Sequence, residues 1–280
     1  MPFDFPTNTE PYTMPIPIPS RVIYDSMQAL NFSGCKELLK SPAHYQAYLT
    51  QPREETKALK VGKYVHTLVL EPEKAVTDFA VLPEGIDRRT KDGKAAYEAF
   101  MSTAEGKTVL TLDEATTAER TARSMTLIKN RLNVSFEFTE LMFTTFINGV
   151  PVKCAVDAVG SDGYLYDLKS SEDASPRGFL KSCYAYAYPL QAHIYRSTFE
   201  AAFSRRLRGF RFIVAEKDVE AGAVYEIGPD LNTRAIVDWE NALQTYKACT
   251  ESGEWPGYPE VVQVIDSNKA ATAATQINFA

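Results

Sequence analysis

Two aspartates and one lysine stand close together in a segment of the sequence that is predicted to form a β-hairpin. Nine residues separate Asp157 from Asp167, and Lys169 follows two positions later. Side chains alternate between the two faces of a strand, so Asp167 and Lys169 share one face. If the hairpin closes at the turn-forming run Ser161-Asp162-Gly163, Asp157 lies across from Asp167. Two carboxylates and one amine would then meet at one point of a sheet.

These are the side chains that metal-assisted hydrolysis of a phosphodiester needs. A divalent cation held by carboxylates neutralises the anionic phosphate and lowers the pKa of a water molecule. Mg²⁺ prefers a few oxygen ligands and keeps water and substrate phosphate in its other positions. A neighbouring lysine can orient the water or stabilise developing negative charge. The pattern is short, however, and a surface hairpin held by salt bridges fits it as well.

The strands that must position these residues are predicted from turn signals and from alternation. Asn148-Gly149 is a two-residue hairpin turn, because both residues tolerate a positive φ. The run that follows has the period of a half-buried strand and leads to Asp157. Its inward-facing positions are Val150, Val152, Cys154 and Val156. Residues 139–147 precede the turn and begin the sheet. Their Glu140 is a candidate further acid, although a solvent-facing carboxylate is the plainer interpretation.

A predicted amphipathic helix over residues 55–70 carries a histidine that could join the acids. Gly62 and His66 are four positions apart and therefore lie on one face of that helix. A glycine here is expected to permit close approach of another element, which would bring His66 to the acidic cluster. From position alone, a core histidine bound to backbone groups is the alternative.

A second helical region follows Lys169 after a polar loop. Ser175-Pro176 is a helix-start signal, and Pro189 is predicted to divide the region into two pieces. In the second piece, Gln191 and Tyr195 are four positions apart and project together. Three tyrosines could stack on bases, although tyrosines near a core usually pack: Tyr184, Tyr186 and Tyr188.

The order and spacing of the acids resemble the signature of the PD-(D/E)xK nuclease superfamily. Asp157 matches the first acid, and Asp167-Leu168-Lys169 matches the second part, with Asp where many relatives have Glu. The resemblance covers about residues 20–215. It implies an α/β fold with a PD-(D/E)xK (restriction-endonuclease-like) core, in which helices flank a central mixed β-sheet.

The helical motifs resemble one branch of that superfamily. Gly62-Lys63-Tyr64-Val65-His66 is similar to the G-x-x-x-H motif of the RecB-like branch, and Gln191 with Tyr195 is similar to its Q-x-x-x-Y motif. Two further runs, Ser41 to Tyr45 and Leu82 to Lys94, resemble the RecE-type (exonuclease VIII) family. Four motifs in the expected order are more specific than any one of them.

The resemblance implies a Mg²⁺-dependent 5′-to-3′ exodeoxyribonuclease that acts on the ends of linear double-stranded DNA. It would leave 3′ single-stranded overhangs for recombination by single-strand annealing. Two Mg²⁺ ions per site are implied, with Mn²⁺ as a substitute. The implied metal ligands are His66, Asp157, Asp167 and the backbone carbonyl of Leu168. Lys169 would position or activate water, while Gln191 and Tyr195 would orient the substrate or that lysine.

The same resemblance implies partners and a setting. We expect a ring-like homo-oligomer, a tetramer or a trimer, with a single-strand annealing protein as partner. The expected location is the cytoplasm of a bacterial or phage-infected cell. Two alternatives are kept: a structure-specific endonuclease on the same scaffold, and a nucleic-acid-binding module without catalysis. A pure binder, however, has no need for mutually repelling carboxylates beside phosphate.

The overall charge does not favour an open DNA-binding surface, because the formal net charge is −6. Retention on DNA is then expected from a closed oligomer in which the channel alone is basic. The candidate contacts for DNA or a 5′-phosphate are Arg88, Arg89, Lys91 and Lys94, in a loop predicted over residues 83–94. A second basic cluster holds Arg205, Arg206, Arg208 and Arg211.

A chain of 280 residues is long enough to bury the core of one large domain or of two small ones. We expect a proline-rich extended arm over residues 1–20, a single nuclease domain over residues 21–265 and a loose tail over residues 266–280. The four cysteines form no C-x-x-C pair and are expected to be reduced core residues. No run is apolar enough to predict a membrane span, and no secretory signal is recognised.

Overall fold

The computed structural model describes residues 17–51 and 56–262. The predicted tail over residues 266–280 and the predicted arm up to residue 16 lie outside the described residues. In the described part of the arm, Ile18 is buried, and its amide donates to the carbonyl of Met142 at 2.7 Å. This part of the chain therefore lies against the edge of the sheet.

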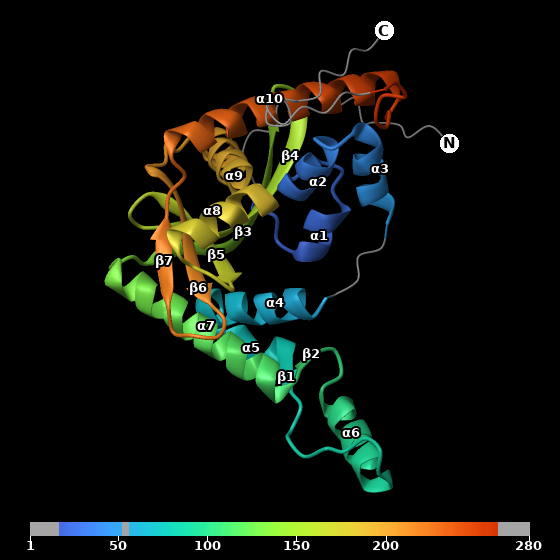
Figure 1. Ribbon diagram of the computed structural model, residues 1–280, viewed down its shortest axis with the longest axis vertical. Helices are drawn as coiled ribbons and strands as arrows, with labels where there is room; N and C mark the ends of the chain where they lie inside the picture. The colour runs from blue at the N-terminus through green and yellow to red at the C-terminus, as the bar shows by residue number, and fades with distance from the viewer. Residues whose placement is uncertain (1–16, 52–55, 263–280) are drawn as a thin grey trace.

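A five-stranded mixed sheet forms the centre of the domain (Figure 1). Its strands are β3 (Phe136–Ile147), β4 (Val150–Gly160), β5 (Tyr164–Ser171), β6 (Gly209–Glu216) and β7 (Gly222–Tyr225). They lie in the order β3-β4-β5-β6-β7; β5 and β6 pair in parallel, and the other three pairs are antiparallel. The predicted α/β class with a central mixed sheet flanked by helices is confirmed.

The turn between β4 and β5 sets the register of the two predicted aspartates. Gly163 has a φ of 83°, a conformation that glycine adopts without strain. Ala158 pairs with Tyr166 beyond this turn. Asp157 therefore lies across from Asp167, as the sequence predicts.

Helices cover both faces of the sheet (Figure 1). On one side lie α4 (Lys57–Leu70) and α7 (Leu112–Arg131), and on the other lie α2 (Phe32–Leu38), α3 (Pro42–Thr50), α8 (Pro176–Tyr186), α9 (Tyr188–Phe203) and α10 (Pro229–Ser252). Each layer has its own apolar cluster. Val65, Met125 and Ile213 are buried in the first, and Phe143 and Phe199 are buried in the second. Because successive strand residues point to opposite faces, the same strands feed both clusters.

The break between α8 and α9 differs from the prediction. The sequence predicts a division at Pro189, but α8 ends at Tyr186, and the next residue, Ala187, has a left-handed backbone with a φ of 57°. Pro189 instead lies in the first turn of α9, where a residue without an N–H sacrifices no hydrogen bond. The proline therefore starts a helix here and does not interrupt one.

A smaller unit joins α4 to α7. It contains a 3₁₀ turn (Pro72–Lys74), α5 (Ala75–Asp78), β1 (Phe79–Val81), α6 (Lys91–Thr103) and β2 (Thr108–Leu110). β1 and β2 pair in parallel, and α6 stands away from the main sheet (Figure 1). The loop predicted over residues 83–94 ends early, because Thr90 caps α6 by accepting from the amide of Gly93 at 3.0 Å.

All four cysteines are buried and free, as predicted. Among residues 17–51 and 56–262, none of the helices combines the length and the apolar composition that a membrane span requires.

A buried lysine ties α1 (Arg21–Ser26) to the sheet. Lys153 of β4 is 6% exposed, and its ammonium donates to the carbonyls of Tyr24 at 2.7 Å and Met27 at 2.8 Å. Acceptors at the end of a helix lack intrahelical donors and favour a cation. The ammonium also lies 4.8 Å from the centre of the Tyr24 ring. Lys153 thereby fixes α1 to β4.

We expect Lys153→Met to lower the free energy of unfolding by about 2 kcal/mol, because it leaves buried carbonyls without their donor. Arg21→Gln is the control, since it removes an exposed ion pair with Asp25 and an exposed contact with the Tyr24 ring, and should change this free energy by less than about 1 kcal/mol. Unfolding in urea measures both variants. Equal stability of Lys153→Met and the wild type would contradict the assigned role.

Candidate active site

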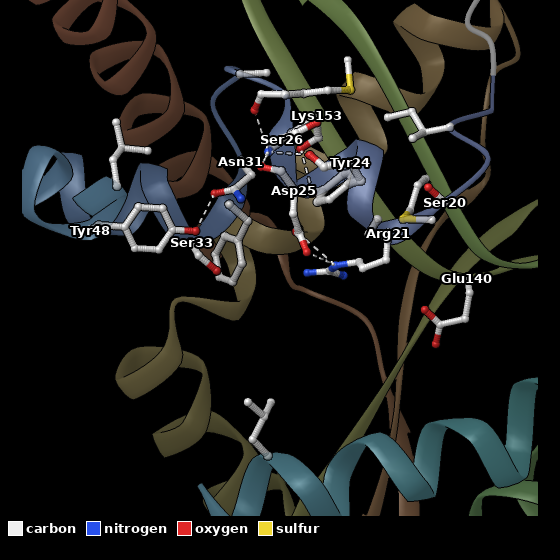
Figure 2. A pocket seen from close by; sticks show the side chains of 18 of the residues that line it. Ser20, Arg21, Tyr24, Asp25, Ser26, Asn31, Ser33, Tyr48, Glu140 and Lys153 are labelled. Carbon is white, nitrogen blue, oxygen red and sulfur yellow. Dashed lines mark hydrogen bonds and ion pairs between the residues drawn. The ribbon is translucent and has the colours of Figure 1, made fainter. Parts of the chain in front are cut away.

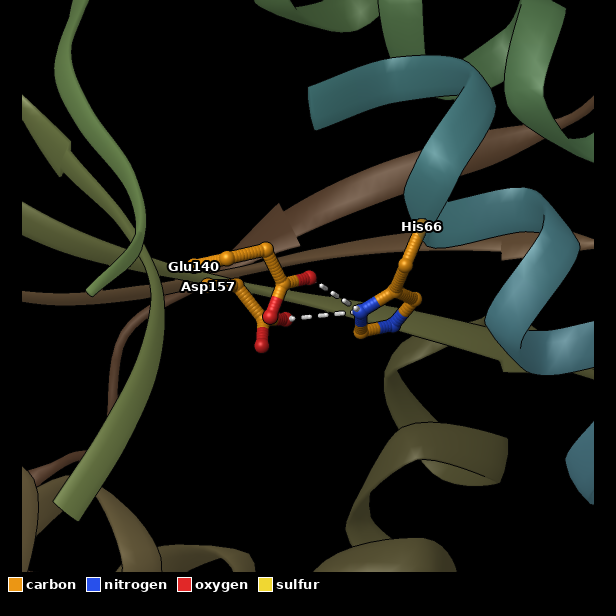
Figure 3. Close-up of side chains that lie close together, drawn as sticks. All are labelled: His66, Glu140 and Asp157. Atoms are coloured by element: carbon orange, nitrogen blue, oxygen red, sulfur yellow. Dashed lines mark ion pairs between the residues drawn. The ribbon is translucent and has the colours of Figure 1, made fainter. Parts of the chain in front are cut away.

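An imidazole and two carboxylates from three elements meet on one side of the sheet (Figure 3). His66 comes from α4, Asp157 from β4 and Glu140 from β3. Nδ1 of His66 lies 3.6 Å from Oδ2 of Asp157 and 3.8 Å from Oε1 of Glu140. One ligand atom from each residue lies within 4.8 Å of the others. We call these three residues the His–acid group.

Glu140 belongs to this group, although the sequence favours a solvent-facing carboxylate. Counting back along both strands from the Asn148-Gly149 turn places Glu140 opposite Asp157, and the neighbouring pair Leu141–Val156 agrees with that register. Glu140 has a φ of 49°, which is uncommon for a residue other than glycine. Backbone strain of this kind gathers at functional sites. The register of the turn is the sequence signal that could have identified Glu140.

A second group of polar side chains lies beside the first. Asp167 is 2% exposed and has a protein partner for each oxygen. Nζ of Lys169 lies 2.6 Å from its Oδ2, and Nε2 of Gln191 donates to its Oδ1 at 2.6 Å. The structure thus brings the predicted Asp–Lys pair together with the predicted glutamine. It also gives Asp167 contacts that differ from those of Asp157, which lies in the His–acid group.

The backbone of Leu168 joins the two groups. Its N–H donates to Oδ2 of Asp157 at 2.7 Å. Its carbonyl lies 3.1 Å from Nε2 of His66, which donates to it when that nitrogen carries a proton. The carbonyl that the resemblance implies as a metal ligand therefore stands at the site and is bound to His66. These contacts fix both side chains relative to β5.

Burial and crowding shift the pKa values of the ionisable groups. Burial raises the pKa of Asp157 and raises the pKa of Asp167 to about 6. Burial lowers the pKa of His66, but Asp157 and Glu140 outweigh it, and the pKa of His66 rises to about 9. Burial also opposes the charge of Lys169, yet Asp167 raises its pKa above the usual value. At neutral pH, a proton on His66 supplies positive charge to the acids.

The His–acid group has the donors that a divalent cation requires. Carboxylate oxygens suit Mg²⁺ and Mn²⁺, and an imidazole nitrogen is a ligand for many transition metals. The positive charge that these acids require is carried by the proton on His66, so a cation bound there would replace that proton. The residues His66, Glu140 and Asp157 therefore fit a metal centre.

Two tyrosines of α9 stand beside the acids. Tyr195 was predicted, and its ring lies 6.3 Å from the ring of Phe32 and 6.2 Å from that of Phe210, between ring centres. Burial raises the pKa of its hydroxyl far above the usual value. For Tyr188 the sequence leaves base stacking and core packing open, and the structure places its ring centre 4.7 Å from Nζ of Lys169. Tyr195 packs beside the site, and Tyr188 covers the lysine.

A cleft of about 2020 Å³ opens at the His–acid group (Figure 2). Its walls come from α1, α2, α3 and α4 and from strands β3 and β4. Gly62 also lines the cleft, and no described atom outside its own helix lies within 4 Å of the place where a Cβ would stand. The expectation that Gly62 permits close approach of another element is therefore wrong. It leaves open space one helical turn from His66.

The basic residues predicted to contact DNA lie outside the lining of this cleft: Arg88, Arg89, Lys91 and Lys94. Arg89 binds Asp87 through two contacts of 2.9 Å, and the guanidinium of Arg88 lies 4.3 Å from the ring centre of Tyr97. Three arginines of the second basic cluster are paired with acids: Arg205 with Glu137, Arg206 with Glu200, and Arg211 with Asp162 and Glu226. Arg208 instead lies over the ring of Tyr164. Ion pairs thus offset the charge of Arg89 in the first segment and of three arginines in the second.

Residues 31–268 match a protein family described as "PDDEXK-like domain of unknown function (DUF3799)". The match covers most of the chain. The prediction of a PD-(D/E)xK domain is thereby confirmed. The match does not distinguish the RecE-type family within this superfamily, so that assignment stays a prediction.

Comparison with solved structures agrees with the fold. A structure from Eubacterium rectale, named as a candidate exonuclease, aligns with a TM-score of 0.57 at 14% sequence identity and covers 88% of this chain and 93% of that chain. At this identity, the likeness shows the fold alone. A second structure, SSO0001, covers 76% of this chain and 84% of that chain at 13% identity, but its TM-score of 0.26 carries no argument. A search of curated proteins finds no match.

Metal binding is expected to release a proton from His66. A pKa of about 9 keeps this histidine protonated at pH 7, and a ligating nitrogen must lose its proton. Binding of Mn²⁺ at pH 7 should therefore release about one proton, and the affinity should rise as the pH rises toward 9. Calorimetry in buffers of different ionisation enthalpy measures this release. Its persistence in His66→Gln would refute the assignment to His66.

Gly62→Ala should raise the free energy of unfolding by about 0.5–1 kcal/mol, because alanine is the better helix former and its Cβ enters open space. Gly34→Ala is the matched control in α2. Its Cβ would stand 2.8 Å from the ring of Tyr45, so it should destabilise the protein. Thermal unfolding compares the two. Destabilisation by Gly62→Ala would show that the space is needed by the folded chain itself.

Proposed function

We propose a specific activity for this chain, which belongs to the family of PDDEXK-like domains (DUF3799): it is a metal-dependent exonuclease that degrades linear double-stranded DNA. The observation that carries the proposal is the junction at Leu168. One backbone unit binds Asp157 and His66 and is followed directly by Lys169. Metal ligands and a cation for the reacting phosphate are thereby held side by side.

We assign His66, Glu140 and Asp157 as the ligands of the metal centre. We place Asp167 beside the same centre, on a different side from these three residues. When bound, a divalent cation supplies charge neutralisation for the phosphodiester and a lower pKa for water. Lys169 and Gln191 hold Asp167 in place. His66 from α4 and Lys169 from β5 offset the negative charge of these carboxylates.

Lys169 is assigned to the reacting water and to the developing negative charge. Its raised pKa keeps it protonated at neutral pH, so it acts as a hydrogen-bond donor and not as a base. Asp167 and the ring of Tyr188 restrict its ammonium from two sides. Gln191 positions the lysine indirectly, through Asp167. We place Tyr195 beside the substrate, since it lines the cleft.

The finer properties rest on the resemblance of the sequence to RecE-type exonucleases. They are 5′-to-3′ polarity, two Mg²⁺ ions with Mn²⁺ as substitute, 3′ overhangs for single-strand annealing, a ring-like trimer or tetramer, an annealing-protein partner and a cytoplasmic location. The Eubacterium rectale protein, a neighbour in fold, is named as an exonuclease, and we propose the same class of activity for this chain. Arg88, Arg89, Lys91 and Lys94 stay proposed contacts for the DNA, at a distance from the cleft.

Asp157→Asn should slow digestion of linear duplex by roughly 10³-fold, and Glu140→Gln should weaken Mn²⁺ binding roughly 10- to 100-fold. Glu137→Gln is the matched control for Glu140→Gln. It also removes a carboxylate from β3, but that carboxylate binds Arg205 outside the His–acid group. Calorimetry with Mn²⁺ and a time course with end-labelled DNA measure the two effects.

Covalently closed circular duplex separates the proposed exonuclease from an endonuclease on the same scaffold. The proposal predicts that linear duplex is degraded while the circle stays intact. Equal digestion of the linear and the circular duplex would contradict the exonuclease assignment and would favour the endonuclease. Full activity of Asp157→Asn would contradict the assignment of the His–acid group as the active site.

A further inference from the structure

The described helices contain four glycines, and three of them have a clear packing reason to be glycine. Gly34, Gly93 and Gly178 each lie in the first turn of a helix, at the third position after the capping residue. A Cβ at any of these positions would overlap a neighbour, which is respectively Tyr45, Asp87 and Asp173. Close packing at the start of the helix therefore requires glycine at all three.

Gly62 differs from these three glycines in both respects. It lies in the interior of α4, well beyond the capping residue Thr56. A glycine in a helix interior is less favourable than alanine, because it loses more backbone freedom on folding. No described atom outside its own helix lies within 4 Å of the place where its Cβ would stand. Packing within the described chain therefore does not require glycine here, and the open space is available to a ligand.

The open space at Gly62 lies beside the proposed reaction site. Gly62 and His66 are one helical turn apart on the same face of α4, which corresponds to about 6 Å along the helix axis. Both residues line the cleft, together with Glu140 and Asp157. A phosphate bound at the His–acid group carries a sugar on each side. One of these sugars is therefore within reach of the space at Gly62.

An exposed leucine lies next to the open space. Leu59 precedes Gly62 by three positions, so the two residues are neighbours on the surface of α4. Leu59 is 50% exposed and lines the same cleft. Ligand sites combine apolar surface with a few polar groups that fix the orientation of the ligand. Apolar surface beside the space suits the carbon skeleton of a sugar better than it suits water molecules around a metal ion.

We propose that the space at Gly62 holds the sugar–phosphate backbone of the strand that is cut, at the nucleotide next to the cleaved phosphate. The missing side chain allows this backbone to approach α4 closely, and Leu59 packs against the sugar. This assignment rests on the proposed nuclease function. It adds a residue that determines how closely the substrate strand can approach the metal centre.

Fluorescence anisotropy with a labelled linear duplex, in the inactive Asp157→Asn background, tests the proposal without turnover. Gly62→Ala should weaken DNA binding roughly fivefold and Gly62→Leu at least about fiftyfold, because each added carbon overlaps the bound backbone. Thermal unfolding should show that both variants are at least as stable as their parent, since in the free protein the new side chains enter open space. Unchanged DNA affinity in Gly62→Leu would overturn the proposal.

Ala58→Leu is the matched control. Ala58 lies on the same face of α4, one turn before Gly62 and two turns before His66, and it also lines the cleft. The same leucine side chain placed there should change DNA affinity by less than about twofold, since contacts away from the centre of a site contribute little. Equal weakening by Ala58→Leu and Gly62→Leu would reduce the effect to bulk anywhere in the cleft and would overturn the assignment to Gly62.

Two further measurements distinguish the backbone from other occupants of the space. Calorimetry with Mn²⁺ on an otherwise wild-type chain should give the same affinity for Gly62→Leu and the wild type. A loss of Mn²⁺ affinity as large as the loss of DNA affinity would assign the space to water around the metal ion. A duplex whose terminal nucleotides lack bases should show the same weakening in Gly62→Leu as intact DNA. Recovery of affinity on that duplex would assign the space to a base. Either result would overturn the backbone assignment.

Activity distinguishes failure of this proposal from failure of the nuclease assignment. On an otherwise wild-type chain, Gly62→Leu should lower kcat/KM for linear duplex at least about fiftyfold, because it excludes the strand from its position at the metal centre. If the wild type cuts DNA and Gly62→Leu cuts it with the same kcat/KM, the assignment of Gly62 alone is refuted. If the wild type does not cut DNA, the nuclease assignment fails, and the anisotropy series still decides whether DNA enters the space at Gly62.

Discussion

Repulsion among neighbouring carboxylates is the constraint on which the rest of the site depends. Glu140, Asp157 and Asp167 lie together on the sheet, and burial raises the pKa of both aspartates. Two cations from different elements offset their charge, His66 from α4 and Lys169 from β5. The helical layer of α4 is therefore more than a cover for the sheet. It supplies the imidazole of His66. The proton on that imidazole lies among oxygen donors that are suited to bind a metal ion.

The part of the site that the sequence predicts is the part that local periodicity controls. The turn at residues 161–163 fixes the register that sets Asp157 against Asp167, and strand alternation places Lys169 with Asp167. Helical spacing aligns Gln191 with Tyr195. The mixed sheet with flanking helices also follows from these elements together with the family resemblance.

The remaining features depend on contacts that no single element encodes. Glu140 joins the site through strand pairing and a positive φ, and its sequence neighbourhood is that of an ordinary exposed carboxylate. Tyr188 reaches Lys169 because the chain breaks at Ala187, whose left-handed backbone is uncommon for alanine. Gly62 faces a cleft between separate segments, so its helical pattern could not distinguish open space from a close contact. Such properties are set by how elements are arranged, which short-range patterns do not specify.

The most direct test of the account is the position of a bound metal ion. Crystals soaked with Mn²⁺ and measured at a wavelength where manganese scatters anomalously would locate it without any assay of activity. The account predicts that the strongest anomalous peak lies in contact with His66, Glu140 and Asp157, and that this peak disappears in Asp157→Asn. A peak elsewhere in the protein, or one that persists in that variant, would contradict the assignment of the His–acid group as the metal centre.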